Sequence, residues 1–135
     1  MTVLFSGDYV EKLVEIGILF DFYGKLLSKK QYSVVELYYI HDLSLSEIGE
    51  ELNISRQGVY DTLKRAEQKL YKFEKDLGLI KKFNSGHDSL RKIISISQDI
   101  MNLANKQGLD EILEKSMEIN RISNRVLENN REVME

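Results

Sequence analysis

The sequence predicts an all-helical protein, and two observations lead to that prediction. Its 135 residues include no proline, the residue most disruptive to the interior of a helix. Apolar residues recur at intervals of three and four along much of the chain, which is the spacing of one face of an α-helix. The clearest pattern of this kind lies in residues 42–70, and the rest of the chain is organised around it.

Residues 42–70, DLSLSEIGEELNISRQGVYDTLKRAEQKL, predict two helices joined by a tight turn. Ser44 and Glu47 have the spacing of a capping box, which begins the first helix. Asn53 lies where the turn needs a positive φ, and Ser55 can cap the second helix. The second helix then carries one apolar stripe: Val59, Leu63, Ala66 and Leu70. Features in this order indicate a helix-turn-helix, the motif that places a helix in the major groove of DNA.

One helix is expected over residues 9–23, near the start of the chain. Asp8 and Glu11 have the spacing of a capping box at its beginning. Gly24 is expected to end it in a left-handed conformation, which costs glycine little.

A second helix is expected to begin at another capping box, Ser28 with Gln31, and to run to about His41. Apolar residues occupy more than one of its faces, so we expect it to be central. In the helix-turn-helix that follows, Gly49 is expected to leave room for the close approach of another helix.

The second helix of the motif is expected to continue to about Leu77, where Gly78 ends it. Residues 83–88, FNSGHD, combine the residue types of turns and predict a linker. A fifth helix is expected over residues 89–107, and a sixth from Asp110 toward the C-terminus. This pattern divides the chain into a helix-turn-helix domain before the linker and a C-terminal helical pair after it.

The predicted boundaries are 1–82 for the domain and 89–135 for the helical pair, which would serve packing or dimerisation. Four apolar residues of the last helix lie seven apart: Ile112, Ile119, Val126 and Val133. A heptad stripe predicts a coiled-coil-like seam, here on the fifth helix or on a second copy of the chain. Polar residues interrupt the stripe: Ser116, Ser123, Asn129 and Asn130. We expect the protein to form a homodimer.

The net charge of −3 is distributed unevenly along the chain. Residues 1–54 have a net charge of −5, residues 55–82 of +4, and residues 83–135 of −2. The positive charge therefore coincides with the second helix of the motif and its continuation. A solvated helix face would explain it, and so would the binding of nucleic acid.

The candidate nucleic-acid contacts are the outward residues of that helix: Ser55, Arg56, Gln57, Tyr60, Lys64, Arg65 and Lys69. In the major groove arginine can bind guanine and glutamine can bind adenine, while lysines hold phosphates. Asp61 opposes this function because its carboxylate repels phosphate. We expect Asp61 to pair with Lys64 or Arg65, three and four residues away.

Three runs of sequence resemble the bacterial YlxM family: FDFYGKLLSKKQ, LYYIHDLSLSEIGEELNISRQGVYDTLKRAEQKL and KFEKDLGLI. The resemblance covers about residues 10–80. It implies a small all-helical protein with a winged-helix-like fold similar to the last DNA-binding region of bacterial sigma factors, and additional C-terminal helices lie beyond it. It also implies a regulatory part in the signal recognition particle pathway, because the genes of the family commonly neighbour those of that particle. We carry nothing over beyond about residue 84.

Two functions stay open on the sequence. One is a nucleic-acid-binding helix-turn-helix regulatory protein, with DNA, or the protein or RNA of the signal recognition particle, as its partner. The other is a protein or ribonucleoprotein interaction module that keeps the motif as a scaffold without binding DNA.

An enzyme is not expected, and neither is a cofactor. His41 and His87 are the only histidines, and neither lies in a metal-binding spacing. No apolar run reaches the length of a membrane span, and the absence of cysteine fits the reducing cytoplasm.

Overall fold

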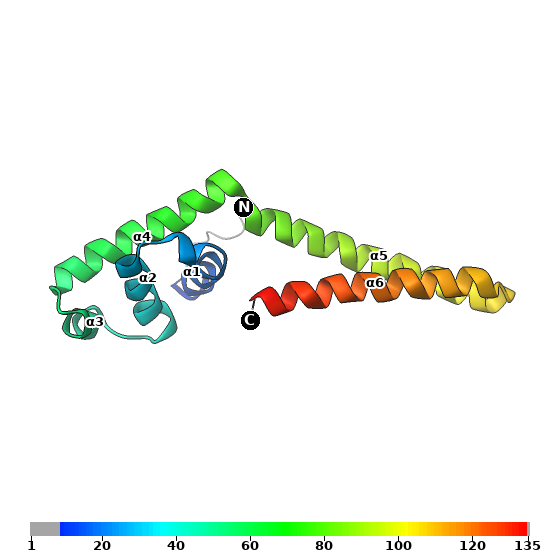
Figure 1. The fold of residues 1–135 in the computed structure, drawn as a ribbon, viewed down its shortest axis with the longest axis horizontal. Helices are drawn as coiled ribbons and strands as arrows, with labels where there is room; N and C mark the ends of the chain where they lie inside the picture. The colour runs from blue at the N-terminus through cyan, green and yellow to red at the C-terminus, as the bar shows by residue number, and fades with distance from the viewer. Residues whose placement is uncertain (1–8, 135) are drawn as a thin grey trace. The chain divides into compact units, whose positions relative to one another are not determined.

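The structure is a computed structural model that describes residues 9–134, with side chains for residues 10–130. The capping box expected at Asp8 therefore lies outside the described residues. The elements are α1 (Tyr9–Tyr23), η2 (Gly24–Leu26), α2 (Lys29–Val35), η3 (Glu36–Ile40), α3 (Leu45–Leu52), α4 (Arg56–Leu77), α5 (Leu79–Gln107) and α6 (Asp110–Met134) (Figure 1). The predicted all-α class is confirmed.

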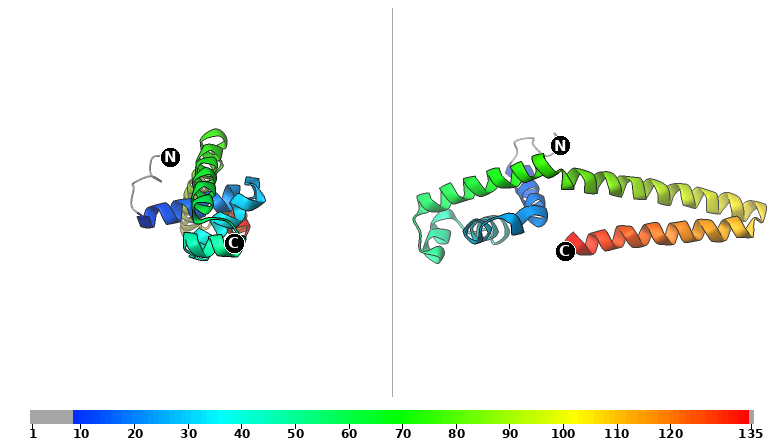
Figure 2. Two further views of the ribbon diagram at one scale, coloured as in Figure 1. Left: turned by 90° about the vertical axis from the view of Figure 1, so that its left-hand side faces the viewer. Right: turned by 45° about the horizontal axis from the view of Figure 1, so that its top comes forward.

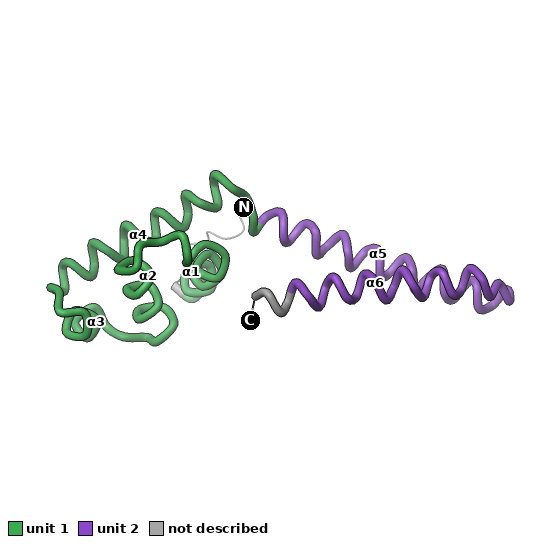
Figure 3. The backbone as a smooth tube through the Cα atoms, in the orientation of Figure 1, with its two compact units in different colours: residues 1–80 green, residues 81–135 purple. Residues whose placement is uncertain are grey.

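Contacts divide the chain into two compact units, residues 1–80 and residues 81–135 (Figure 3). The division falls two residues before the end predicted for the helix-turn-helix domain. Within the described residues, no helix combines the length and the apolar character needed to cross a membrane.

In the first unit, α1, α2 and α3 all pack against α4 (Figure 1). The stripe predicted on α4 is buried, from Val59 and Leu63 through Ala66 to Leu70. The other helices contribute these buried residues: Ile16, Leu19 and Tyr23 from α1, Val34 and Val35 from α2, and Ile48 from α3. Because every other helix of the unit rests on α4, that helix fixes the core.

The structure confirms the helix caps and the turn that the sequence predicts around the motif. Both complete capping boxes are present, one begun by Ser28 and the other by Ser44. Asn53 ends α3 in the left-handed region, with φ 55° and ψ 46°. Ser55 caps α4, because its Oγ atom accepts a hydrogen bond from the backbone N–H of Gly58 at 3.0 Å. These caps depend on residues within four positions of one another, so the sequence alone predicts them.

Two glycines have roles that differ from the predicted ones. Gly24 does not adopt a positive φ; it begins η2, and a Cβ atom there would lie 2.9 Å from the ring of Phe20. At Gly49 a Cβ atom would lie 2.8 Å from the carbonyl oxygen of Ile54. The neighbour that Gly49 admits is therefore the backbone of the turn, whose Ile54 N–H donates to the Gly49 carbonyl at 2.9 Å, and not another helix.

The first unit also buries three carboxylates, and each accepts a hydrogen bond from a tyrosine. The pairs are Glu15 with Tyr71, Glu67 with Tyr39, and Glu74 with Tyr23. Burying a carboxylate is costly unless it is hydrogen-bonded, so each tyrosine offsets part of that cost. Each pair also joins two segments that are distant in sequence.

Glu74 fixes the backbone between α4 and α5. Its Oε1 atom accepts from the Tyr23 hydroxyl at 3.0 Å and from the backbone N–H of Ile80 at 2.8 Å. The Tyr23 hydroxyl accepts in turn from the backbone N–H of Leu79 at 3.1 Å. Two N–H groups at the start of α5, which no helical bond satisfies, therefore have partners from the core.

In the second unit, the part of α5 from Lys81 onward and α6 lie side by side and form a hairpin (Figure 2). The linker predicted at residues 83–88 is wrong, because these residues are helical and belong to α5. His87, expected in a polar loop, is buried, and its ring lies 4.2 Å from that of Phe83 one turn earlier. Packing of Phe83 and His87 thus outweighs the weak helix propensity of the residues between them.

The seam of the hairpin, defined as the residues of α5 and α6 that face each other, combines small and polar side chains with half-buried large apolar ones: Ile94, Met101, Leu113 and Leu127. Ser97, Ala104, Ser116 and Ser123 are its buried residues. Across it, the Asn120 Nδ2 atom donates to the Ser97 Oγ atom at 3.0 Å. Two of the residues that interrupt the heptad stripe, Ser116 and Ser123, are therefore buried in the seam.

The heptad stripe itself does not face α5. Ile112, Ile119 and Val126 are 48%, 44% and 41% exposed, and the side chain of Val133 lies outside the described residues. Packing of this stripe on the fifth helix is therefore a wrong prediction. Packing on a second copy stays a prediction.

We expect the substitution Gly49→Ala to lower the melting temperature and Gly17→Ala to raise it. Alanine at position 49 collides with the Ile54 carbonyl group, whereas a Cβ atom at Gly17, inside α1, meets nothing within 4 Å. Alanine favours a helix interior by about 1 kcal/mol over glycine, so only the collision separates the two variants. Thermal unfolding followed by circular dichroism measures both, and a stabilised Gly49→Ala variant would contradict the close contact.

We expect Glu15→Gln to stabilise the protein at pH 7 and to lose that advantage in acid. Burial raises the pKa of Glu15 above its ordinary 4.5, although the hydrogen bond from Tyr71 opposes the shift. A raised folded-state pKa favours folding at low pH, and this contribution disappears as the pH rises through the raised value. Melting temperatures at pH 7 and pH 4.5 test this, with exposed Glu50→Gln as the control. An equal gain at both pH values would count against it.

Candidate nucleic-acid interface

The N-terminal half of α4 presents the residues that the sequence singled out. Ser55, Arg56, Gln57, Tyr60, Arg65 and Lys69 are exposed, and the side chain of Lys64 is 42% exposed. Because α4 buries the opposite stripe, residues spaced by four, such as Gln57, Asp61 and Arg65, point outward together. The sequence thus predicted correctly which side of α4 is exposed. Contacts between these residues and nucleic acid stay a prediction.

Asp61 does not have the partner expected for it. Its Oδ1 atom accepts from the Gln57 Nε2 atom at 3.0 Å, one turn earlier on the same face. The pairing predicted with Lys64 or Arg65 is wrong, because Lys64 is drawn to another carboxylate. The amide that would read an adenine is therefore engaged within the helix, and binding a base would have to replace this bond.

Lys64 pairs with Glu67, a carboxylate that the sequence did not single out. The Lys64 Nζ atom lies 3.4 Å from Glu67 Oε2 and 5.5 Å from the centre of the Tyr60 ring. Burial alone would lower the pKa of Lys64, but the Glu67 carboxylate outweighs burial and raises it. Lys64 stays charged, while the carboxylate beside it cancels part of its field.

The Glu67 carboxylate interacts with three hydrogen-bond or ion-pair donors in a partly enclosed site. Besides Lys64, its Oε2 atom lies 3.3 Å from the Nζ atom of Lys12 on α1, and its Oε1 atom accepts from the Tyr39 hydroxyl. These side chains line a cavity of about 120 Å³. Sequence reasoning could not find this cluster, because its members come from α1, η3 and α4.

Lys69 lies toward α2. Its Nζ atom hydrogen-bonds the Gln31 Oε1 atom at 3.3 Å, in the first turn of α2. Lys29 and Lys30, also exposed, belong to that turn. Lys69 therefore joins a second basic group beside the start of α2 rather than the first turn of α4.

Two further exposed residues of α4 extend its outward face. Gln68 and Lys72 follow Asp61 by seven and eleven residues, so they share its side of the helix. Helical spacing alone could have identified both. Lys72 is paired with Asp76 at 2.6 Å, which leaves Gln68 as the additional candidate contact.

Charge is mixed around this face. Among the described residues, neither Arg56 nor Arg65 takes part in an ion pair. The preceding helix, α3, exposes three carboxylates: Glu47, Glu50 and Glu51. Two unpaired arginines can attract phosphate, and the carboxylates of α3 weaken that attraction. The described part of the chain also contains no group of acidic or histidine residues able to hold a metal ion.

Comparison of this chain with known proteins also identifies a helix-turn-helix, in agreement with the structure. A family described as "Putative helix-turn-helix protein, YlxM / p13 like", UPF0122, matches residues 10–115. The chain belongs to this family. No solved structure matches it. The UPF0122 match extends beyond residue 84, where the resemblance seen in the sequence ended, and reaches the first turns of α6.

Individual UPF0122 relatives are similar over most of their length. One from Desulforamulus reducens is 44% identical over 107 residues, covering 77% of this chain and 92% of that protein. Another from Acetivibrio thermocellus is 42% identical over 114 residues, covering 82% and 97%. A third, from Thermoanaerobacter, is 47% identical over 104 residues, covering 77% and 86%.

We expect Glu67→Gln to make the face around α4 more attractive to polyanions. The substitution removes the carboxylate that Lys64 and Lys12 share, while the amide oxygen can still accept from Tyr39. Duplex DNA affinity at low salt should rise, and the slope of log K against log salt should steepen by about 1. Fluorescence anisotropy measures both. Glu114→Gln, the same charge change on an exposed residue of α6, is the control, and an equal effect there would contradict the local explanation.

Proposed function

We propose that this UPF0122 protein is a nucleic-acid-binding helix-turn-helix regulatory protein of the cytoplasm. The N-terminal half of α4 would contact duplex DNA. Arg56 and Arg65 would supply its unpaired cations, and Gln57 and Tyr60 would lie against the groove. Its cellular setting would be the signal recognition particle pathway, which rests on the family resemblance alone.

One observation carries the proposal: the exposed side of α4 keeps two arginines that pair with none of the described carboxylates. An arginine held free beside a helix N-terminus can bind phosphate, or bind guanine through two parallel hydrogen bonds. The Ser55 cap sets where the helix begins and therefore where Arg56 projects. The turn at Asn53 supports the same geometry, because it sets the direction in which α4 leaves α3.

A second function is favoured by the charge around the motif. Lys64 is paired with Glu67, Gln57 with Asp61, and α3 exposes carboxylates beside α4. A surface of mixed sign suits a protein or a ribonucleoprotein better than a bare duplex. In this alternative the motif is a scaffold, and the protein or RNA of the signal recognition particle is the partner.

We expect Arg65→Ala to weaken duplex binding uniformly across sequences, by about 3- to 10-fold at low salt. It should also reduce the salt slope by about 1, because one phosphate contact is lost. Fluorescence anisotropy against a mixed-sequence duplex, over a range of salt concentrations, measures this. Arg121→Ala, an exposed arginine of α6, is the matched control. Absence of binding by the unmodified protein at micromolar concentration, or an equal loss in the control, would refute DNA binding through α4.

One further experiment, on charge-reversal variants, distinguishes the two functions. Purified signal recognition particle protein and RNA are tested for capture by the unmodified chain and by the charge reversals Arg56→Glu and Arg65→Glu. DNA binding through α4 predicts that duplex binding disappears while any capture of the particle survives. The scaffold function predicts no duplex binding at the outset and capture by the unmodified chain. Lys64 is left unchanged because reversing it would place a carboxylate against buried Glu67.

A further inference from the structure

The hairpin of α5 and α6 leaves many of its large apolar side chains exposed beside its seam. Seven of these side chains are between 41% and 58% exposed: Ile93, Ile96, Leu103, Ile112, Ile119, Ile122 and Val126. Serines and one alanine occupy the most buried seam positions, and four larger apolar residues of the seam are half-buried: Ile94, Met101, Leu113 and Leu127. Amphipathic helices usually expose few large apolar residues, so the exposed ones need a separate explanation. A second packing surface is therefore built into this hairpin.

The exposed residues form a second stripe on each helix. On α5, Ile93, Ile96, Ile100 and Leu103 each come one residue before a position of the seam, and Ile100 is half-buried. The stripe on α6 also consists of residues that each come one position before a seam residue: Ile112, Ile119, Ile122 and Val126. One residue corresponds to a turn of about 100° around a helix, so each stripe lies beside the seam.

Both stripes point to the same side of the hairpin. The contact between Asn120 and Ser97 and the short connection at Gly108 make the two helices antiparallel, as Figure 2 shows. In an antiparallel pair, one step toward the N-terminus rotates the side chains of both helices toward the same face. We call this continuous surface the apolar face, and it comprises the eight residues of the two stripes.

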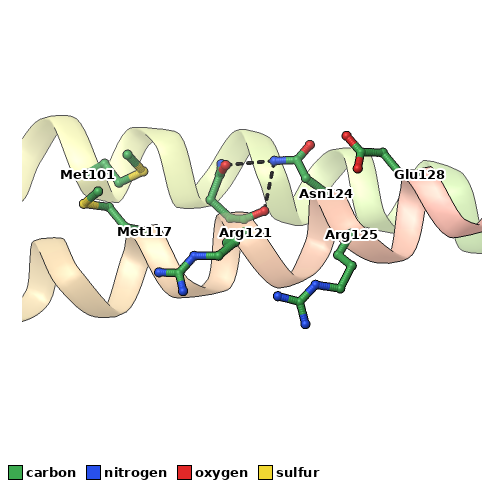
Figure 4. A pocket seen from close by; sticks show the side chains of 7 residues that line it. Met101, Met117, Arg121, Asn124, Arg125 and Glu128 are labelled. Atoms are coloured by element: carbon green, nitrogen blue, oxygen red, sulfur yellow. Dashed lines mark hydrogen bonds between the residues drawn. The ribbon is translucent and has the colours of Figure 1, made fainter.

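The opposite side of the hairpin is polar. One step after the seam, α5 carries Ser95, Gln98 and Asn102, all exposed. On α6 the corresponding side bears Arg121, whose guanidinium group Figure 4 shows turned away from α5 beside an open pocket, and Met117, which is 47% exposed. The apolar face is therefore the side of the hairpin with more exposed large apolar residues.

We propose that the apolar face is the surface on which a second copy of this chain docks, so that two hairpins form a four-helix bundle. The proposal is independent of nucleic-acid binding and gives the expected homodimer a specific interface. An interface with the same patch on both copies is what a twofold dimer requires.

The dimensions of the face and its edges suit a stable dimer. α6 has 25 residues and is therefore about 37 Å long, and two helices side by side are roughly 20 Å wide. The apolar face occupies the part of this length nearest Gly108, from Ile112 to Val126, which is about 22 Å. It therefore covers roughly 450 Å², so a pair would bury about 900 Å² through the face itself. The polar edges beside the face would extend the contact toward the roughly 1,200–2,000 Å² of stable protein interfaces, as the rim of an interface does.

The charges around the face favour a second copy over a lipid surface. On α6, one described charged side chain lies within the apolar face: Lys115, between Ile112 and Ile119. The outer edges carry three bases and three acids: Lys92, Asp99 and Lys106 on α5, with Glu111, Glu118 and Arg125 on α6. A helix that binds anionic lipid needs a clear excess of basic residues at its polar boundary. Balanced edges instead allow two identical faces to meet without net repulsion.

The test is the mass of the full chain in solution, measured by light scattering coupled to gel filtration at tens of micromolar. We expect twice the 15.7 kDa of one chain. The double variant Ile96→Asp with Leu103→Asp should elute as a monomer, because each aspartate would be buried without a partner in the bundle. Its dimer dissociation constant should rise at least about a hundredfold.

The matched control is Gln98→Asp with Asn102→Asp, which adds the same charges to the polar side of the same helix. It should remain a dimer. Ile119→Asp provides an independent test from α6, and circular dichroism shows that each variant keeps its helices. A one-chain mass for the unmodified protein would overturn the proposal. So would a dimer that survives all apolar-face substitutions, or equal dissociation in the control.

Discussion

The structure of the first unit depends on the burial of two carboxylates on α4, seven residues apart and therefore on one side of that helix. Glu67 and Glu74 cannot be buried without donors, and the donors come from α1, η3 and the start of α5. A rotation of α4 would separate both carboxylates from these donors, although the Oε2 atom of Glu74 is buried without a hydrogen-bond partner even in the observed orientation. The polar contacts therefore restrict α4 to one orientation, which apolar packing alone would specify less strongly.

That constraint also shapes the candidate interface. Fixing the inner side of α4 fixes the outer side, so Arg56 and Arg65 are held outward by contacts made elsewhere. The same carboxylate that anchors the helix lies beside Lys64 and takes part of its charge. Stability and attraction for polyanions thus compete at Glu67. This competition explains why the surface is less basic than the count of lysines and arginines on α4 indicates.

The hairpin of α5 and α6 is packed differently from the first unit. Its most buried seam positions carry small side chains, and a hydrogen bond between Asn120 and Ser97 defines the register of the two helices. The larger apolar residues of the seam are only half-buried, which limits their hydrophobic stabilisation. Other large aliphatic side chains are exposed beside the seam, and their burial would add stabilisation. Two serines that interrupt the heptad stripe in the sequence, Ser116 and Ser123, are therefore part of the internal packing.

The sequence by itself determined the features that depend on neighbours in the chain. The caps at Ser28, Ser44 and Ser55 and the left-handed turn at Asn53 involve residues no more than four apart, so local chemistry is sufficient to predict them. At residues 83–88 the turn composition gave a wrong prediction, because Phe83 and His87, four residues apart, pack within one continuous helix. Only the tertiary structure decided which side of α6 meets α5, and that Glu67, bound by Lys12 and Tyr39, is the carboxylate beside Lys64. These outcomes depend on contacts between distant residues, and no local pattern contains the energy of such contacts.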